Sequence, residues 1–330
     1  MQSYANSDAI QPQFAYWNAF SANPVHLPVD FPAGENTVAT SEQIRIMFSI
    51  EQTQMLLTAV PKAYSARIQE ALLTALAQTL SEWSGQSSFL VDVESHGRDH
   101  PWEDIDLSRT VGWFTTISPI LFTVAGNQIE TNLQSIKAQF RTALNYSFAY
   151  GTLRYLSTKY ELPDYPRSEV SFNYLGQFDI AQFDTAQFDT AQPDTAQFDT
   201  EKFNASIPAA TAPLLERIQQ PLGSTQSLLQ PKHYRLEING AIDAGQLYLD
   251  WSYSRDQYHC STMLHLTQRF RDYLLDLIES SQSESNQTSQ TGYNPSDVAL
   301  VKLDPSQLEA VLSQVAFEPI NIADEPGGHS

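Results

Sequence analysis

The sequence predicts an α/β domain in which helices flank a mixed β-sheet. Three observations lead to this fold class. Segments with the period of a strand alternate with longer segments of helical period, two consecutive strands near residue 245 are joined by a short turn region, and a long helix follows them. The chain has 330 residues, of which 42% are hydrophobic, so one large domain or two modest ones can form a packed core.

The first expected strand follows an irregular lead-in, residues 1–40. The lead-in is rich in proline, asparagine and aromatic residues. Its FAYWNAF segment predicts a short helix end, and NPVHLPVDFPAGEN predicts an irregular connector. Residues 43–50, QIRIMFSI, predict a strand with one buried face. That face carries Ile44, Ile46, Phe48 and Ile50.

Three long helices are expected where apolar residues recur every three or four positions. The first spans residues 61–83, and Pro61 suits its first turn. Its apolar stripe consists of Ile68, Leu72, Leu76 and Leu80. The second helix spans residues 127–144 and the third spans residues 257–280, each with the same spacing.

Four more strands complete the expected sheet. Residues 88–94 and 168–174 alternate between an apolar and a polar face. The apolar faces carry Val91, Val93, Val170, Phe172 and Tyr174, and the polar faces carry Asp92, Glu94, Ser171 and Asn173. Residues 233–240 and 246–254 predict the two strands of a hairpin around the turn region NGAIDAG.

Two segments differ in kind from the predicted domain. Residues 177–201 contain five copies of a pentapeptide related to QFDTA, a period that suits neither helix nor strand. We expect an inserted, exposed and disordered loop there, with a docking tract as the less favoured alternative. Residues 281–330 predict a polar linker, a short helix over 303–315 that begins at Asp304 and Pro305, and a loose tail.

Charge and cysteine content exclude several classes of function. The formal charge is −20, so we expect neither nucleic acid nor an anionic membrane as a partner. Cys260 is the only cysteine, which excludes an intrachain disulfide and a cysteine-based zinc site and favours the cytoplasm. We expect no signal peptide at MQSYANSDAI and no transmembrane helix.

The segment VESHGRDH, residues 93–100, gathers the side chains most suited to chemistry. His96 and His100 have the spacing of metal ligands on a helix, but Gly97 and the following proline disfavour a helix, so the metal hypothesis is weak. The chain has no G-x-S-x-G and no glycine-rich phosphate loop. Glu94 at a strand end could act as an acid or base if burial raises its pKa. Spacing alone favours an ordinary ion pair between Glu94 and Arg98.

Longer motifs carry a family resemblance. VDVESHGRDHPWEDIDLSRTVGWFTTISPILF, AYGTLRYLS and VSFNYLGQFD, in this order, resemble motifs of the epimerization domains of nonribosomal peptide synthetases, which are relatives of the condensation domains. Ser95 replaces the usual glycine of the family's V-E-G-H-G-R-E motif, and Asp99 replaces its second glutamate. The resemblance covers roughly residues 10–313. The family's H-H-x-x-x-D-G motif is absent from these 330 residues.

The resemblance implies a chloramphenicol-acetyltransferase-like fold of two lobes. It implies that residues 41–280 are the C-terminal lobe, after a lead-in at 1–40 from the missing N-terminal lobe. The implied reaction inverts the α-carbon of an aminoacyl or peptidyl thioester, carried on the phosphopantetheine arm of a carrier domain, with no cofactor bound directly. By its position, Glu94 is the implied catalytic residue.

The resemblance also suggests residues around the active-site tunnel. Asn173 and Tyr174 match positions associated with the tunnel, although both could simply satisfy backbone groups. His96 and Arg98 belong to the glutamate's motif, where a structural histidine and a brace for the loop are the simpler expectations. Trp113 lines or supports the tunnel, with core packing as the stronger expectation.

Three hypotheses follow from the resemblance. The chain is half of a split epimerase that needs a separate N-terminal lobe, a truncated remnant that binds carrier or neighbouring domains, or a fragment of a condensation domain that forms peptide bonds. VGWFT and FNYLG disfavour the last of these. We expect the chain alone to be inactive and to expose an apolar face.

Overall fold

A six-stranded mixed sheet organises the part of the chain that the computed structural model describes. The described residues are 1–19, 26–98, 101–102, 105–107, 109–164, 167–178 and 226–285. The strands are β1 (Ser41–Met47), β2 (Ser88–Ser95), β3 (Thr116–Thr123), β4 (Val170–Gln177), β5 (Leu236–Asp243) and β6 (Gln246–Ser254). The predicted pentapeptide loop beyond residue 178 and the linker, helix and tail beyond residue 285 lie outside the described residues.

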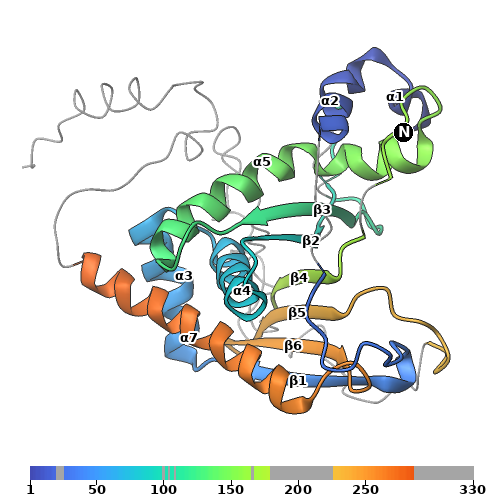
Figure 1. Cartoon of the computed structure of the whole chain (residues 1–330). Coiled ribbons are helices and arrows are strands. Elements are labelled where there is room, and N and C mark those ends of the chain that lie inside the picture. Colours follow the sequence, from blue (N-terminus) through green and yellow to red (C-terminus); the bar gives the residue numbers. More distant parts are fainter. Residues whose placement is uncertain are drawn as a thin grey trace, which may run out of the picture. The chain divides into compact units, whose positions relative to one another are not determined.

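The strand order is β1-β6-β5-β4-β2-β3 (Figure 1). β2, β4 and β5 run parallel in the middle, so that Val91, Val170 and Leu236 lie level with one another. β6, β1 and β3 are added antiparallel at the two sides. The predicted α/β class with a mixed sheet is therefore confirmed.

Helices pack against one face of this sheet. They are α1 (Gln2–Ala5), α2 (Gln11–Ala19), α3 (Ile50–Tyr64), α4 (Ile68–Ser84), α5 (Ile129–Leu156) and α7 (Cys260–Ser285), with short 3-10 turns at Asp8–Ile10 and Val38–Thr40. α3, α4 and α7 contact one another and the strands, while α5 runs along the edge strand β3 and continues past it (Figure 1). α1 and α2 lie on the C-terminal half of α5.

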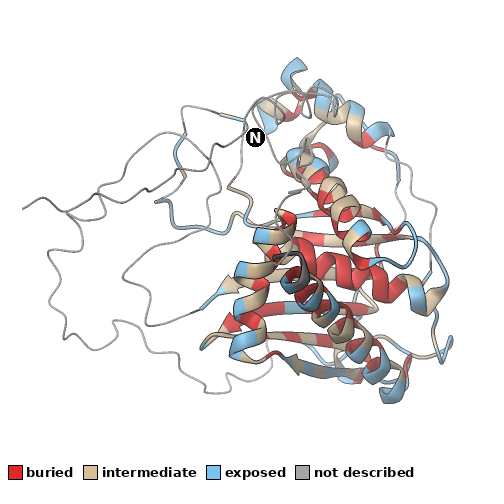
Figure 2. Ribbon diagram, turned by 90° about the vertical axis from the view of Figure 1, so that its left-hand side faces the viewer, coloured by how far each residue is buried: buried red, intermediate tan, exposed pale blue. Residues whose placement is uncertain are grey.

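The hydrophobic core fills the space between these helices and the sheet. The buried residues, red in Figure 2, follow the strands and the helices packed on them. Val91, Phe172 and Trp251 supply the sheet side of this core. Residues 70–80 of α4 are buried on every side, so the predicted one-sided stripe is wrong: α4 lies between α3, α5 and α7 rather than at the surface.

The helix predicted over residues 61–83 is in fact the end of one helix and the whole of the next. Ser49 caps α3 through a capping box with Gln52, so α3 begins well before the predicted start and Pro61 lies in its last turn. Ser65 then takes a left-handed conformation, with φ of 50°. The apolar spacing continues across this break, and the sequence pattern therefore does not reveal it.

Three other boundaries differ from the prediction. β3 is a strand that the sequence patterns do not predict; it contains Pro119, which an edge strand tolerates because one side of its backbone needs no partner. α5 continues past the predicted end at residue 144 to Leu156, and its second half packs on Trp17 in a small separate cluster. The hairpin turn is only Ala244–Gly245, both with positive φ, so NGAID belongs to β5.

Candidate active site

The face of the sheet opposite the helices carries polar side chains at one level of neighbouring strands. The register pairs Asn173 of β4 with Asn239 of β5, and Asn239 with Asp250 of β6. The parallel ladder between β2 and β4 ends at Val93 and Phe172, and its register extended by one position places Glu94 level with Asn173. Glu94 and Asn173, which are far apart in the sequence, are therefore brought to adjacent strands on the same face.

Glu94 is half-buried near the end of β2, two residues from Asp92 on the same face. Burial raises the pKa of the Glu94 carboxyl above its usual value, because the charged form loses solvation. Among the described residues, no side chain or backbone group makes a hydrogen bond or an ion pair with this carboxylate. The predicted ion pair between Glu94 and Arg98 is not formed.

Arg98 instead holds the loop that follows β2. Its guanidinium donates to the backbone oxygens of Leu107 and Thr110, the latter at 3.0 Å, and lies 4.7 Å from the centre of the Phe114 ring. His96 is exposed, and its Nδ1 accepts the backbone N–H of Arg98 at 3.1 Å. These contacts suit a structural role for both residues; a role in the tunnel stays a prediction.

Gly97 explains why this loop requires a glycine. Its φ is +65°, and a Cβ added there would lie 1.6 Å from the backbone oxygen of Phe114. The chain leaving Glu94 thus passes directly against the backbone of the VGWFT segment, which only glycine allows.

The structure separates Asn173 from Tyr174. Asn173 lies on the polar face with Glu94, whereas Tyr174 packs against the hydrophobic core on the helix side. Asn173 is therefore the better placed of the two to meet a group held near Glu94. The predicted tunnel role of Tyr174 has no support from this placement.

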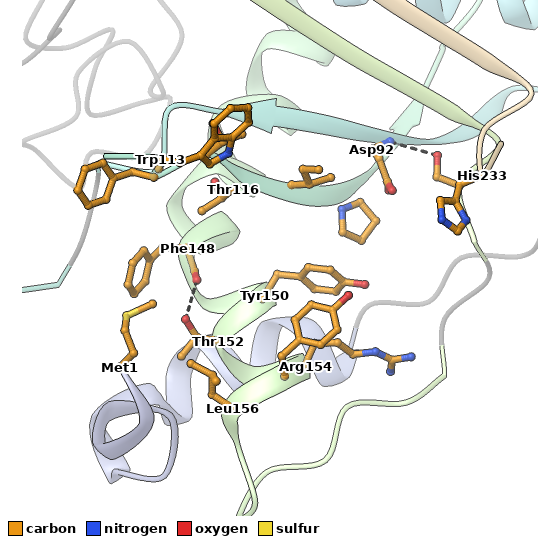
Figure 3. A pocket seen from close by; sticks show the side chains of 18 of the residues that line it. Met1, Asp92, Trp113, Thr116, Phe148, Tyr150, Thr152, Arg154, Leu156 and His233 are labelled. Atoms are coloured by element: carbon orange, nitrogen blue, oxygen red, sulfur yellow. Dashed lines mark hydrogen bonds between the residues drawn. The ribbon is translucent and has the colours of Figure 1, made fainter. Parts of the chain in front are cut away.

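Trp113 borders a large cavity beside the polar face. The cavity has a volume of about 1220 Å³ and lies between β2 and β3, the loop before β3, and the second half of α5. Figure 3 shows Asp92 and Trp113 facing it from the sheet side, with Tyr150 and Arg154 on α5 opposite. The side chain of Trp113 is 90% exposed, so the expectation of core packing is wrong.

Sequence reasoning missed one pair at this site, Asp92 and Tyr234. The Tyr234 hydroxyl donates to Asp92 Oδ2 at 2.8 Å, across the intervening strand β4. Burial raises the pKa of Asp92, although the hydrogen bond from Tyr234 opposes the shift. Burial and the charge of Asp92 raise the pKa of Tyr234, and the charge of Glu94 adds to this shift. The alternation of β2 signals that Asp92 shares the face of Glu94, but nothing in the sequence signals Tyr234.

The arrangement suits proton transfer better than metal chemistry. No group of three or more histidine, cysteine or acidic side chains gathers within the described residues as a metal site. A desolvated carboxylate without a partner among the described residues can accept a proton from a weak carbon acid, and Asn173 beside it can donate a hydrogen bond. None of the helices in the described ranges is long and apolar enough to cross a membrane.

Comparison with known proteins places this site in context. Residues 1–293 match the family described as the condensation domain. One of the chains of linear gramicidin synthase from Brevibacillus parabrevis is 32% identical over 321 residues, which cover 95% of this chain and 4% of that protein. Gramicidin S synthase 1 of Brevibacillus brevis is 28% identical over 323 residues, covering 96% of this chain and 27% of that protein. The chain thus spans only a small part of these relatives.

Among solved structures, the epimerization domain from the third module of tyrocidine synthetase B is similar to this chain. Its TM-score is 0.70 at 26% identity, over 86% of this chain and 58% of that one. SgcC5 from Streptomyces globisporus has a TM-score of 0.55 at 14% identity, over 84% of this chain and 57% of that one. The second likeness concerns the fold alone.

Proposed function

This chain belongs to the condensation-domain family, and from that membership we propose that it forms the Glu94-bearing part of an epimerization domain of a nonribosomal peptide synthetase. The observation that carries the proposal is Glu94 itself, a half-buried carboxylate at a strand end with a raised pKa. The likeness to an epimerization domain of tyrocidine synthetase B supports it.

The proposed reaction inverts the α-carbon of an aminoacyl or peptidyl thioester from L to D. The Glu94 carboxylate takes the α-proton, and the electron pair of the broken C–H bond moves into the thioester carbonyl as an enolate. The side-chain amide of Asn173, on the adjacent strand, donates to the enolate oxygen as its charge develops. Protonation of the α-carbon from the opposite face then gives the D configuration and restores the thioester.

The proton for the opposite face must come from a second acid. In the family resemblance this acid is the histidine of H-H-x-x-x-D-G, a motif that none of the seven histidines of this sequence forms. We therefore propose that the chain acts together with an N-terminal lobe that carries this motif. That lobe and Glu94 would flank the α-carbon.

The proposed partners follow from the substrate. The thioester is held on the phosphopantetheine arm of a carrier domain, so a carrier domain and the neighbouring synthetase domains are the expected partners. Several relatives are synthetases of which this chain spans a small part, which supports neighbouring domains as partners. We expect the reaction in the cytoplasm, the compartment that a single cysteine favours.

A condensation reaction is the second candidate, because the matching family is described as the condensation domain. It differs in outcome: a condensation domain joins an acceptor amine to the thioester carbon and leaves the α-carbon unchanged. A third hypothesis is a remnant that binds carrier domains without catalysis.

The test measures exchange of the α-proton. A carrier domain loaded with an L-aminoacyl group is incubated with the chain in deuterated water, with and without an N-terminal lobe carrying H-H-x-x-x-D-G, and mass spectrometry follows deuterium uptake. The Glu94→Gln variant is the main comparison. Glu161→Gln, which changes an exposed glutamate outside the site, is the matched control.

We expect exchange in the assembled pair, a loss of about 10²–10⁴-fold in Glu94→Gln, and no change in Glu161→Gln. Dipeptide formed on a second, acceptor carrier without α-exchange would favour condensation. If a pair shown to assemble gives neither product, the non-catalytic remnant is the better account.

A further inference from the structure

The cavity beside Glu94 takes no part in the proton transfer itself. It begins next to the catalytic carboxylate, because Ile117, which faces Glu94 across the β2–β3 ladder, is part of its wall. Asp92 and Gly97, on either side of Glu94 in the sequence, also line it. Its volume, about 1220 Å³, is somewhat above the usual range of small-molecule sites, about 300–1,000 Å³. A thioester and a further substituent of the α-carbon fit in this space.

Most of the wall is apolar or aromatic. Trp113, Ile117, Phe148 and Tyr155 line it from the loop, the sheet and α5. Trp113 and Tyr155 are strongly exposed, so their ring faces are available to a ligand. A bulky apolar or aromatic side chain would cover these surfaces and remove them from water.

One anionic group interrupts this apolar wall. Asp92 lies on the sheet side of the cavity and is held by the Tyr234 hydroxyl at 2.8 Å (Figure 3). The cations that also line the cavity do not neutralise it: Arg154 pairs with Asp164 at 2.8 Å, and neither Arg167 nor His233 forms an ion pair with Asp92. Within the described residues, Asp92 is thus a largely buried carboxylate that faces open space without a cation, an arrangement that a bound cation would stabilise.

The distance between Asp92 and Glu94 matches the dimensions of an aminoacyl group. Two residues apart on one strand, their Cα atoms are about 6.6 Å from each other and their side chains point the same way. An α-carbon in contact with Glu94 has its nitrogen about 1.5 Å away. A hydrogen bond of about 2.8 Å from that nitrogen then reaches Asp92.

We propose that this cavity binds the substrate's free α-ammonium group at Asp92 and a bulky apolar or aromatic side chain against Trp113 and α5. The preferred substrate class is therefore an aminoacyl thioester with a free amine, rather than a peptidyl thioester, whose nitrogen is an uncharged amide. The inference rests on the proposed function, since it places the α-carbon at Glu94. It goes beyond it by naming the class of substrate.

The amine is tested by binding, which does not depend on turnover. Calorimetry compares two stable amide analogues, L-phenylalanyl- and N-acetyl-L-phenylalanyl-aminopantetheine, with the wild-type chain and with Asp92→Asn. We expect the wild type to bind the free amine at least tenfold more tightly, and Asp92→Asn to lose this preference. Equal affinities in the wild type, or no binding of either analogue, overturn the proposal.

The size of the pocket is tested at Gly151 on α5, which lines the cavity. A Cβ added there meets nothing within 4 Å, so a larger side chain extends into open space without a clash. We expect Gly151→Leu to weaken binding of the L-phenylalanyl analogue at least tenfold while it leaves the L-alanyl analogue unchanged. Gly151→Ala is the matched control and should bind both normally. If Gly151→Leu affects neither analogue, the side chain does not bind in this cavity and the proposal is wrong.

These tests separate this inference from the proposed function. α-Proton exchange that depends on Glu94, combined with equal affinities for the two phenylalanyl analogues, would retain the epimerase and overturn the substrate class. Preference for the free amine without any exchange in an assembled pair would retain the binding site and overturn the epimerase.

Discussion

Replacement of Arg141 by methionine should strongly destabilise the fold, because it leaves a buried carboxylate without its cation. Glu70, in the first turn of α4, is 1% exposed. Arg141 Nε donates to Glu70 Oε1 at 2.6 Å, and Nη2 donates to Glu70 Oε2 at 3.1 Å. Nη2 also donates to the backbone oxygen of Ser65 at 3.0 Å, in the break between α3 and α4.

The magnitude follows from these contacts. Two hydrogen bonds between charged groups contribute about 1.5–3 kcal/mol each, hence about 3–6 kcal/mol together. Removal of one partner of a buried ion pair costs about 3–5 kcal/mol, in agreement with that sum. Once Arg141 is gone, the backbone N–H of Arg67, at 2.8 Å, is the remaining donor to Glu70 among the described residues.

Urea unfolding followed by circular dichroism measures the effect. With an m-value of about 3 kcal/mol/M, a loss of about 3–5 kcal/mol lowers the midpoint by about 1–1.7 M. The double variant Glu70→Gln/Arg141→Met removes the uncompensated charge as well and should recover much of the loss. A cost below about 1 kcal/mol for Arg141→Met, or a double variant no more stable than the single one, would refute this reasoning.

Two further predictions concern the catalytic strand and its loop. Gly97→Ala should lower α-proton exchange about 10²-fold, because the added Cβ overlaps the Phe114 backbone and displaces the loop after Glu94; Gly85→Ala, with a similar φ of +70° and open space around it, should leave exchange unchanged, and equal activities would contradict this account. The raised pKa of Asp92 means that the folded state binds its proton more tightly than the unfolded state, so this residue lowers stability as pH rises from the usual carboxyl pKa to the raised value; Asp92→Asn should flatten that part of a urea-unfolding series, and an unchanged pH dependence would argue against burial as the cause.

The parts of the fold that sequence patterns predict are those with simple periodicity. Alternating residues predict β2 and β4, and the apolar faces of both strands are the buried ones. The break at Ser65 has no such pattern because apolar spacing continues through it, and the groups that hold it come from α5, far along the chain: Arg141 at Ser65, and Lys137, whose Nζ donates to the Tyr64 oxygen at 3.0 Å. Tertiary contacts of this kind have no local signal.

The same division applies to the site. Glu94 can be identified because its strand ends there and because a long motif resembles a known family. The role of Asp92 depends on Tyr234, which lies 142 positions away and reaches it across β4. The resemblance suggests Asn173 and Tyr174 together, and only the strand register separates them, since adjacent residues of a strand face opposite sides of the sheet.

The two faces of the sheet therefore carry opposite energetic roles. On the helix side, burial of apolar residues and the Glu70–Arg141 pair stabilise the fold. On the other side, burial disfavours the charged forms of Asp92 and Glu94, and raised carboxyl pKa values are a cost to stability near neutral pH. A carboxylate can act as a base toward a weak carbon acid only if it is poorly solvated, so the property that makes Glu94 reactive also makes it destabilising. The packed face offsets that cost and fixes the strands rigidly enough for Glu94 and Asp92 to keep their spacing.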